Sequence, residues 1–184
     1  MAAVKRGSAV TRQRGNAIKA RESVLEVTGP VAQFFSRYRR VGLDTICFIY
    51  HLSRHPLYAP ITGDLFAMIE TGRLQAVTSS LALIEILARP KELGHQAAVE
   101  SYQVLLATFP NLELRRSDIA ITEQAADLSV RYRLTPPEAI QLATAIVDGA
   151  EVFVGNSEAL RGVREIKVVL LEDVRASTPS GGRA

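Results

Sequence analysis

The sequence contains a single cysteine, Cys47, and no long run of hydrophobic residues. One cysteine cannot form an intramolecular disulfide, so the fold does not depend on an oxidising compartment. No stretch reaches the roughly 18 consecutive apolar residues that a membrane-spanning helix needs, and the N-terminus lacks the apolar core of a secretory signal. We therefore expect a soluble, cytoplasmic protein that does not associate with membranes.

Several signatures of common enzyme classes are also missing. The chain has no GxxxxGK or GxGxxG phosphate loop and no GxSxG nucleophile turn. His51 and His55 stand four residues apart, a spacing that can hold zinc, but Pro56 follows at once and no HExxH pattern is present. These absences direct the search for a functional site to the acidic residues.

Charge is distributed unevenly along the chain. Residues 1–40 contain nine Lys or Arg and two Glu, for a formal charge of +7, whereas the remainder carries −4. We divide the chain into a flexible basic extension at 1–40, a folded domain at 41–174 and a flexible tail at 175–184. The extension could neutralise nucleic-acid phosphates, act as a solvated tail or organellar targeting segment, or lie upstream of the natural start.

Short apolar runs alternate with helical patterns from Val41 onward. We predict strands at 41–44, 74–78, 112–115, 151–154 and 167–171, and helices at 45–53, 60–72, 81–88, 94–108, 117–132 and 136–148. Apolar strands separated by helices indicate a parallel sheet that is covered on both faces. The expected fold class is therefore α/β, a three-layer α/β/α sandwich around a central parallel sheet.

Three acidic residues stand out by their positions in this pattern. Asp44 ends the first strand, where open α/β sheets carry their ligand sites, and Glu138 lies in the first turn of a helix. Glu85 interrupts the apolar LALIEILA helix, in which Ile84 and Leu87 are expected to face the core. Each acid also has an ordinary interpretation, as a helix cap, a salt-bridge partner or a favourable charge at a helix N-terminus.

Carboxylates that gather at the strand ends would form a site with oxygen ligands only. Hard ions such as Mg²⁺ or Mn²⁺ accept such a ligand set. These ions activate water and stabilise charge on a phosphodiester during displacement. Such a set of acids would support metal-dependent phosphodiester chemistry if the side chains converge.

From Val41 to about Val174 the chain resembles the PIN-domain ribonucleases, and in particular the VapC-type toxins of bacterial toxin–antitoxin systems. The resemblance rests on LDTICFIY after a short strand, on SSLALIEIL and on TPPEAIQLATAIVDGAEVFVGNSEAL. It implies that Asp44, Glu85 and Glu138 hold one or two divalent ions for RNA cleavage. It also implies a homodimer that is neutralised by a cognate antitoxin.

Two features depart from the family pattern. Glu138 stands where the family usually has Asp, and Gly155-Asn156-Ser157 stands in place of Thr-Asn-Asp, so Ser157 replaces the fourth acid. We interpret the chain as a Mg²⁺- or Mn²⁺-dependent endoribonuclease, the toxin of a type II toxin–antitoxin module, with Asn156 and Ser157 as polar residues of the site. The alternative is a catalytically degenerate PIN-like module that binds RNA or a protein partner. A third possibility is an unrelated phosphatase or small-molecule enzyme on a doubly wound sheet.

Overall fold

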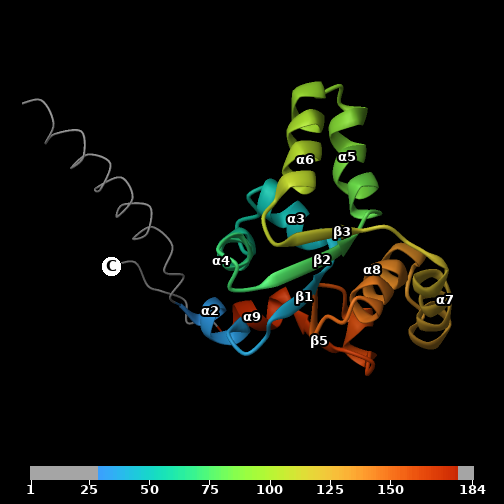
Figure 1. The fold of residues 1–184 in the computed structure, drawn as a ribbon. Coiled ribbons are helices and arrows are strands. Elements are labelled where there is room, and N and C mark those ends of the chain that lie inside the picture. Colours follow the sequence, from blue (N-terminus) through green and yellow to red (C-terminus); the bar gives the residue numbers. More distant parts are fainter. Residues whose placement is uncertain (1–28, 178–184) are drawn as a thin grey trace, which may run out of the picture.

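The structure is a computed structural model that describes residues 29–177; residues 1–28 and 178–184 lie outside the described part. Its centre is a five-stranded, fully parallel sheet with the strand order β3-β2-β1-β4-β5 (Figure 1). The strands are β1 (Arg40–Leu43), β2 (Gln75–Ser79), β3 (Leu112–Arg115), β4 (Val152–Gly155) and β5 (Lys167–Leu170). All five predicted strands are present.

The strand order reverses at the centre of the sheet. From β1 the chain builds outward to β2 and β3, and then crosses to the other side of β1 to form β4 and β5. Gly42 of β1 accordingly pairs with Val77 of β2 on one side and with Phe153 of β4 on the other. A crevice at the C-terminal ends of β1 and β4 is the position where such sheets bind ligands.

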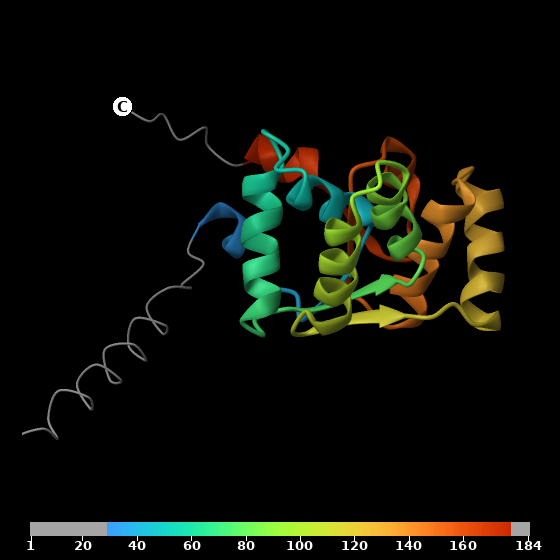
Figure 2. The same ribbon diagram turned by 90° about the horizontal axis from the view of Figure 1, so that it is seen from above.

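Helices cover both faces of the sheet. They are α2 (Pro30–Phe35), α3 (Thr45–Leu52), α4 (Ala59–Glu70), α5 (Ala82–Glu92), α6 (Gln96–Thr108), α7 (Ile119–Tyr132), α8 (Pro136–Val147), the 3-10 helix η1 (Glu158–Gly162) and α9 (Leu171–Ser177). Figures 1 and 2 both show α4 and α7 on opposite sides of the sheet. No helix among residues 29–177 is both long and apolar enough to span a bilayer.

Two separate hydrophobic cores follow from the alternation of side chains along the strands. Val41 and Leu43 of β1 point into a core formed with α2, α3, α4 and α9. Phe153 and Leu170 point to the other face, into a core formed with α7 and α8. The predicted three-layer α/β/α sandwich with a central parallel sheet is therefore confirmed.

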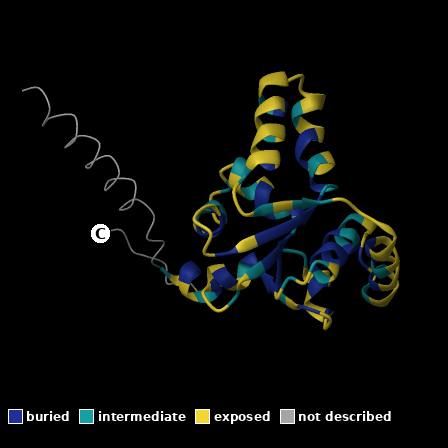
Figure 3. Cartoon of the chain, in the orientation of Figure 1, coloured by how far each residue is buried: buried dark blue, intermediate teal, exposed yellow. Residues whose placement is uncertain are grey.

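Helices α5 and α6 form a hairpin that extends away from the sheet, and most of its surface is exposed (Figure 3). Helix α5 continues through Pro90 to Glu92, beyond the predicted end at residue 88. Pro90 has no N–H to donate to the carbonyl of Ile86, so the helix lacks one hydrogen bond at this point. The backbone N–H of Leu93 still donates to the carbonyl of Arg89 at 3.1 Å.

Helix α2 packs into the core, although it lies within the segment predicted as a flexible extension. Its side chains Val31 and Phe35 are 3% and 0% exposed, and they belong to the same core as β1. Residues 30–40 are thus part of the folded domain, which begins before the predicted boundary at Val41. The rest of the predicted extension, residues 1–28, lies outside the described residues.

The end of the domain also extends further than the sequence indicated. The run KVVLL was predicted as a strand to residue 171, but the strand ends at Leu170 and helix α9 begins at Leu171. Leu171 and Val174 are both 0% exposed, and burial of these two side chains explains why the chain turns back as a helix. The described part of the predicted tail therefore includes helical residues up to Ser177.

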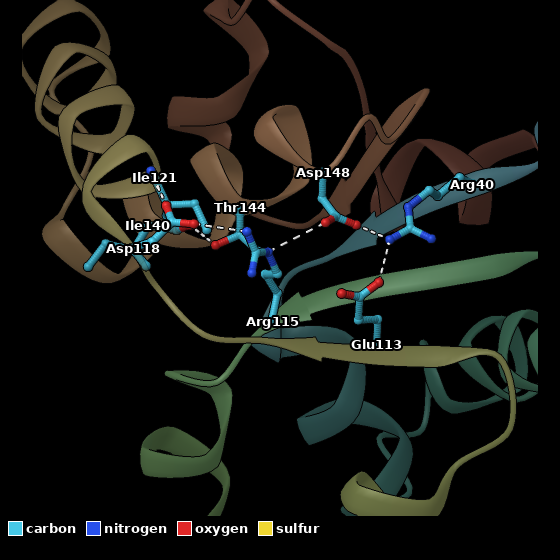
Figure 4. Close-up of polar contacts among 8 residues, drawn as sticks. All are labelled: Arg40, Glu113, Arg115, Asp118, Ile121, Ile140, Thr144 and Asp148. Carbon is cyan, nitrogen blue, oxygen red and sulfur yellow. Dashed lines mark hydrogen bonds and ion pairs between the residues drawn. The ribbon is translucent and has the colours of Figure 1, made fainter.

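A chain of ion pairs ties β1, β3, α7 and α8 together (Figure 4). Arg40 of β1 contacts Glu113 of β3 at 2.8 Å and also contacts Asp148 at the end of α8. Arg115 reaches the same Asp148 at 3.6 Å and pairs with Asp118, the N-cap of α7, at 2.9 Å. Asp148 is only 15% exposed, and two arginines compensate its negative charge.

Helix α8 lies unusually close to β1 at Gly42. A Cβ atom added to Gly42 would lie 2.3 Å from the Cβ of Ala145 and 3.0 Å from the Phe153 ring. Neither neighbour can move away, because both are buried in the second core. The glycine in β1 and the alanines of α8 therefore set the distance between sheet and helix.

We predict that Gly42→Ala destabilises the protein by about 2–3 kcal/mol, since the added methyl group overpacks a rigid contact. Gly63→Ala is the matched control. Gly63 lies inside α4, and its added Cβ would meet only the His51 ring at 3.9 Å. Gly63→Ala should stabilise the protein by about 0.5–1 kcal/mol, because alanine loses less backbone entropy than glycine when a helix forms. Urea denaturation measures both; equal effects for the two variants would contradict the close contact.

Candidate active site

Asp44 lies at the C-terminal end of β1 and caps helix α3. Its backbone N–H donates to the carbonyl of Val154 at 2.9 Å, and its Oδ1 accepts from the N–H of Ile46 at 3.2 Å. The end of β4 leaves room for this carboxylate. A Cβ atom on Gly155 would lie 3.1 Å from Asp44 Oδ2, so the glycine at this position keeps the space beside the carboxylate open.

Glu85 reaches this region from helix α5. The expectation that Ile84 faces the core was wrong, because Ile84 is 65% exposed whereas Ala82 and Ile86 are buried. The buried face of α5 is rotated away from Ile84, and Glu85 lies at its exposed border. The Glu85 carboxylate accepts a hydrogen bond from the Thr45 hydroxyl at 2.5 Å. Thr45 follows Asp44 directly in the chain.

Glu138 is held at the start of helix α8 by a capping box. Its Oε2 accepts from the backbone N–H of Thr135 at 3.0 Å and from the Thr135 hydroxyl at 2.7 Å. Burial acts to raise the pKa of Glu138, but hydrogen bonds from Ser157 and Thr135 outweigh burial and hold that pKa below its usual value. The structure therefore places Ser157 beside Glu138.

Asn156 makes its hydrogen bonds away from the three acids. Its Oδ1 accepts from the backbone N–H of Glu172 in α9 at 3.0 Å. Its amide nitrogen lies 3.5 Å from the hydroxyl of Tyr50, which stacks on Tyr58 at 4.7 Å between ring centres. Asn156 thus connects the end of β4 to α3 and α9, directly beside the segment that carries Ser157.

A group of buried polar residues beneath the acids was missed by the sequence analysis. Thr45, Thr78, Ser79 and Gln141 are each at most 2% exposed. Gln141 of α8 contacts the other three and the Glu85 carboxylate. The signal that could have revealed it is the glutamine within AIQLATAI, a polar residue on the face of a helix that is otherwise apolar.

Glu85 and Glu138 act electrostatically on Asp44. The pKa of Asp44 is raised to about 6, first by burial and then by the negative charges of Glu85 and Glu138, against the hydrogen bond from Ile46. No arginine or lysine is among these influences. Asp44 thus contrasts with Asp148, since no cationic side chain in the described part of the chain, residues 29–177, compensates its negative charge.

The oxygen donors suit a hard divalent ion in chemistry and in charge. Their spacing is wider than that of a closed ligand shell: across residues 29–177, no three acidic, histidine or cysteine side chains are grouped tightly enough to hold one ion together. Glu138 in particular is turned toward Thr135 by its capping hydrogen bonds. Ligation of one ion by all three carboxylates therefore requires side-chain rotation from this arrangement.

Comparison with known families matches residues 41–165 of the chain to the PIN domain. The match covers more than half of the sequence, and the chain therefore belongs to the PIN-domain family. Comparison with curated proteins finds no match.

Solved structures with the same fold include three toxin–antitoxin assemblies. A toxin–antitoxin complex from Klebsiella pneumoniae aligns with a TM-score of 0.56 and 20% identity, over 72% of this chain and 97% of the other. VapBC2 from Rickettsia felis, bound to a promoter DNA fragment, aligns with a TM-score of 0.57 and 15% identity, over 71% of this chain and 98% of the other. DNA-bound VapBC from Salmonella typhimurium aligns with a TM-score of 0.56 and 16% identity, over 73% of this chain and 98% of the other. At these identities the likeness is one of fold.

We predict that Asp44→Asn stabilises the metal-free protein at pH 8. The pKa of Asp44 is about 6 when folded, above its usual value of 3.8, so the native state holds its proton at higher pH than the unfolded chain does. This group therefore lowers stability as the pH rises from 4 through 6. The variant should exceed wild type by about 3 kcal/mol at pH 8 and match it near pH 4. Urea denaturation in excess EDTA measures the difference, and a gap independent of pH would contradict the raised pKa.

Proposed function

We propose that this protein is a divalent-metal-dependent endoribonuclease that acts in the cytoplasm as the toxin of a type II toxin–antitoxin module. One observation carries the proposal. Asp44 lies at the crevice between β1 and β4, its pKa is raised first by burial and then by two neighbouring carboxylates, and no cation among residues 29–177 is found to offset these effects. Elsewhere the protein compensates a buried acid with arginines, as at Asp148. An uncompensated acidic crevice suits a bound divalent cation.

In this proposal Asp44, Glu85 and Glu138 hold Mg²⁺ or Mn²⁺. The ion, when bound, supplies charge stabilisation for a phosphodiester and lowers the pKa of water. The protein's own part is positioning. Gly155 leaves room for the Asp44 carboxylate, and the hydroxyl of Thr45 orients Glu85. Asn156 supports the site at its rim by fixing the segment that precedes Ser157.

The proposed partners are an RNA substrate, a cognate antitoxin and a second copy of the chain. The family membership supports the nuclease activity, because PIN domains are generally nucleases. The shared fold with the toxin–antitoxin complexes supports the antitoxin partner. Co-expression with the product of a neighbouring small gene, followed by co-purification, tests the antitoxin directly. The oligomeric state of the purified chain tests the homodimer.

A second candidate function is that of a PIN-like module that binds RNA or a protein partner without cleaving it. Two observations favour it. Glu138 already has a structural role, since it accepts two hydrogen bonds from Thr135 as a helix cap. Ser157 contributes a hydroxyl in place of the expected fourth carboxylate, so the crevice carries less negative charge to hold an ion.

Substitution of Ser157 separates the two candidates. Ser157→Asp adds a carboxylate beside Glu138 and should tighten Mn²⁺ binding and raise RNA cleavage, because a charge attracts a divalent ion far more strongly than a hydroxyl does. Ser157→Asn is the matched control, because asparagine has nearly the size of aspartate but no charge. It should leave Mn²⁺ affinity near that of wild type. Asp44→Asn should abolish both binding and cleavage.

Isothermal titration calorimetry with Mn²⁺ and a cleavage assay on a structured RNA measure these effects. The binding-module candidate predicts a different pattern, in which wild type and Ser157→Asp are both inert and neither binds the ion. An equal gain from Ser157→Asp and Ser157→Asn would show that size, and not charge, determines the effect.

A further inference from the structure

Gln141 connects four elements of the fold beneath the acidic crevice. On one side its Oε1 lies 3.3 Å from the backbone nitrogen of Ser79 and 3.2 Å from the hydroxyl of Thr78, both in β2. On the other side its Nε2 donates to the hydroxyl of Thr45 in α3 and lies 3.3 Å from Oε2 of Glu85 in α5. The side chain is 2% exposed, so water cannot replace these partners freely.

The neighbours determine which way the amide points. The backbone N–H of Ser79 can only donate, and it therefore requires the carbonyl oxygen of Gln141. The ionised carboxylate of Glu85 can only accept, and it therefore requires the amide nitrogen. Glutamine satisfies both demands at once. Leucine satisfies neither, and an ionised glutamate would present only acceptors to Glu85.

Glu85 depends on this arrangement for its orientation. The residue lies at the exposed border of α5, where a long side chain otherwise populates many rotamers in water. Two contacts hold its carboxylate toward the crevice, one from the hydroxyl of Thr45 at 2.5 Å and one from Gln141. The hydroxyl of Thr45 accepts from Gln141 in turn, so both contacts depend on the same amide.

We infer that Gln141 is a positioning residue, which fixes the carboxylate of Glu85 and the hydroxyl of Thr45 toward Asp44 by linking them to the backbone of β2. The inference rests on the proposed function, because it concerns the acid that is proposed to hold the metal ion. It adds to that function a residue outside the acidic set, which contacts neither the substrate nor the ion. A purely structural glutamine would contribute to stability alone.

The test compares Mn²⁺ affinity with thermal stability in Gln141→Leu and in a matched control. Thr144→Val removes another buried polar group from α8, since Thr144 is 0% exposed and its hydroxyl donates only to the carbonyl of Ile140 at 2.7 Å. Both variants are expected to have a lower thermal midpoint. Only Gln141→Leu is expected to weaken Mn²⁺ binding, by roughly tenfold or more, as loss of a residue that orients a metal ligand does.

Thr45→Val provides a second variant that keeps the shape of the site and removes the bridging hydroxyl. It should weaken Mn²⁺ binding to a similar degree, and the double variant should lose less than the sum of the two, because both act on Glu85. If Gln141→Leu does not fold, the Mn²⁺ affinity of Thr45→Val tests the same link from Gln141 through Thr45 to Glu85.

The possible failures can be told apart. Wild-type Mn²⁺ affinity in Gln141→Leu or in folded Thr45→Val, with a lowered thermal midpoint, would overturn the positioning role and leave the proposed function intact. Absence of Mn²⁺ binding in the wild-type protein would overturn the proposed function and the positioning role together. An equal loss of affinity in Thr144→Val would also overturn the specific role of Gln141.

Discussion

The close approach of α8 to β1 is the contact on which the rest of the site depends. Gly42 lacks the side chain that would collide with Ala145, so the helix lies directly on the central strand. This approach brings the N-terminal half of α8 to the end of β1. Glu138 is then near enough to raise the pKa of Asp44, and Gln141 is near enough to reach β2 and α3.

The treatment of negative charge distinguishes the structural acids from the candidate site. Asp148 lies between two arginines and joins sheet to helix, which is a stable use of a half-buried acid. Asp44 instead faces Glu85 and Glu138. Repulsion between like charges destabilises the folded state, and proteins tolerate it mainly at functional sites. Binding of a cation would relieve the repulsion among the three carboxylates. The same reasoning explains why Gly155 matters, since it keeps that carboxylate accessible.

The sequence predicted the fold well because short apolar strands and amphipathic helices have local signatures. It placed all five strands and the helices between them, and the family resemblance is confirmed by the PIN-domain match. It failed where distant packing decides the outcome. Helix α2 is helical because Phe35 fills the core beside α4 and α9, and the stretch around Ile84 is rotated because the hairpin extends beyond the sheet.

The candidate site was predicted in part. Positions at strand ends and helix starts indicated Asp44 and Glu138 from spacing alone, whereas Glu85 was singled out for a buried setting that it does not occupy. Their assignment as metal ligands stays a prediction. The glutamine within AIQLATAI could have indicated a buried polar group, but its partners could not be predicted, because they come from three other elements and meet only in the folded chain. The capping bonds of Glu138 do have a sequence signature, a threonine followed three residues later by a glutamate, which the sequence analysis did not use.

The most direct test is a carbon-13 NMR titration of the Asp44 carboxyl group, without metal and with saturating Mg²⁺. Without metal the account predicts a pKa of about 6, because burial and two neighbouring carboxylates disfavour the ionised form. With Mg²⁺ the pKa should fall well below that value, since the cation favours the carboxylate. A pKa near the usual 3.8 that Mg²⁺ does not change would contradict the central claim that this crevice is an uncompensated acidic site for a divalent ion.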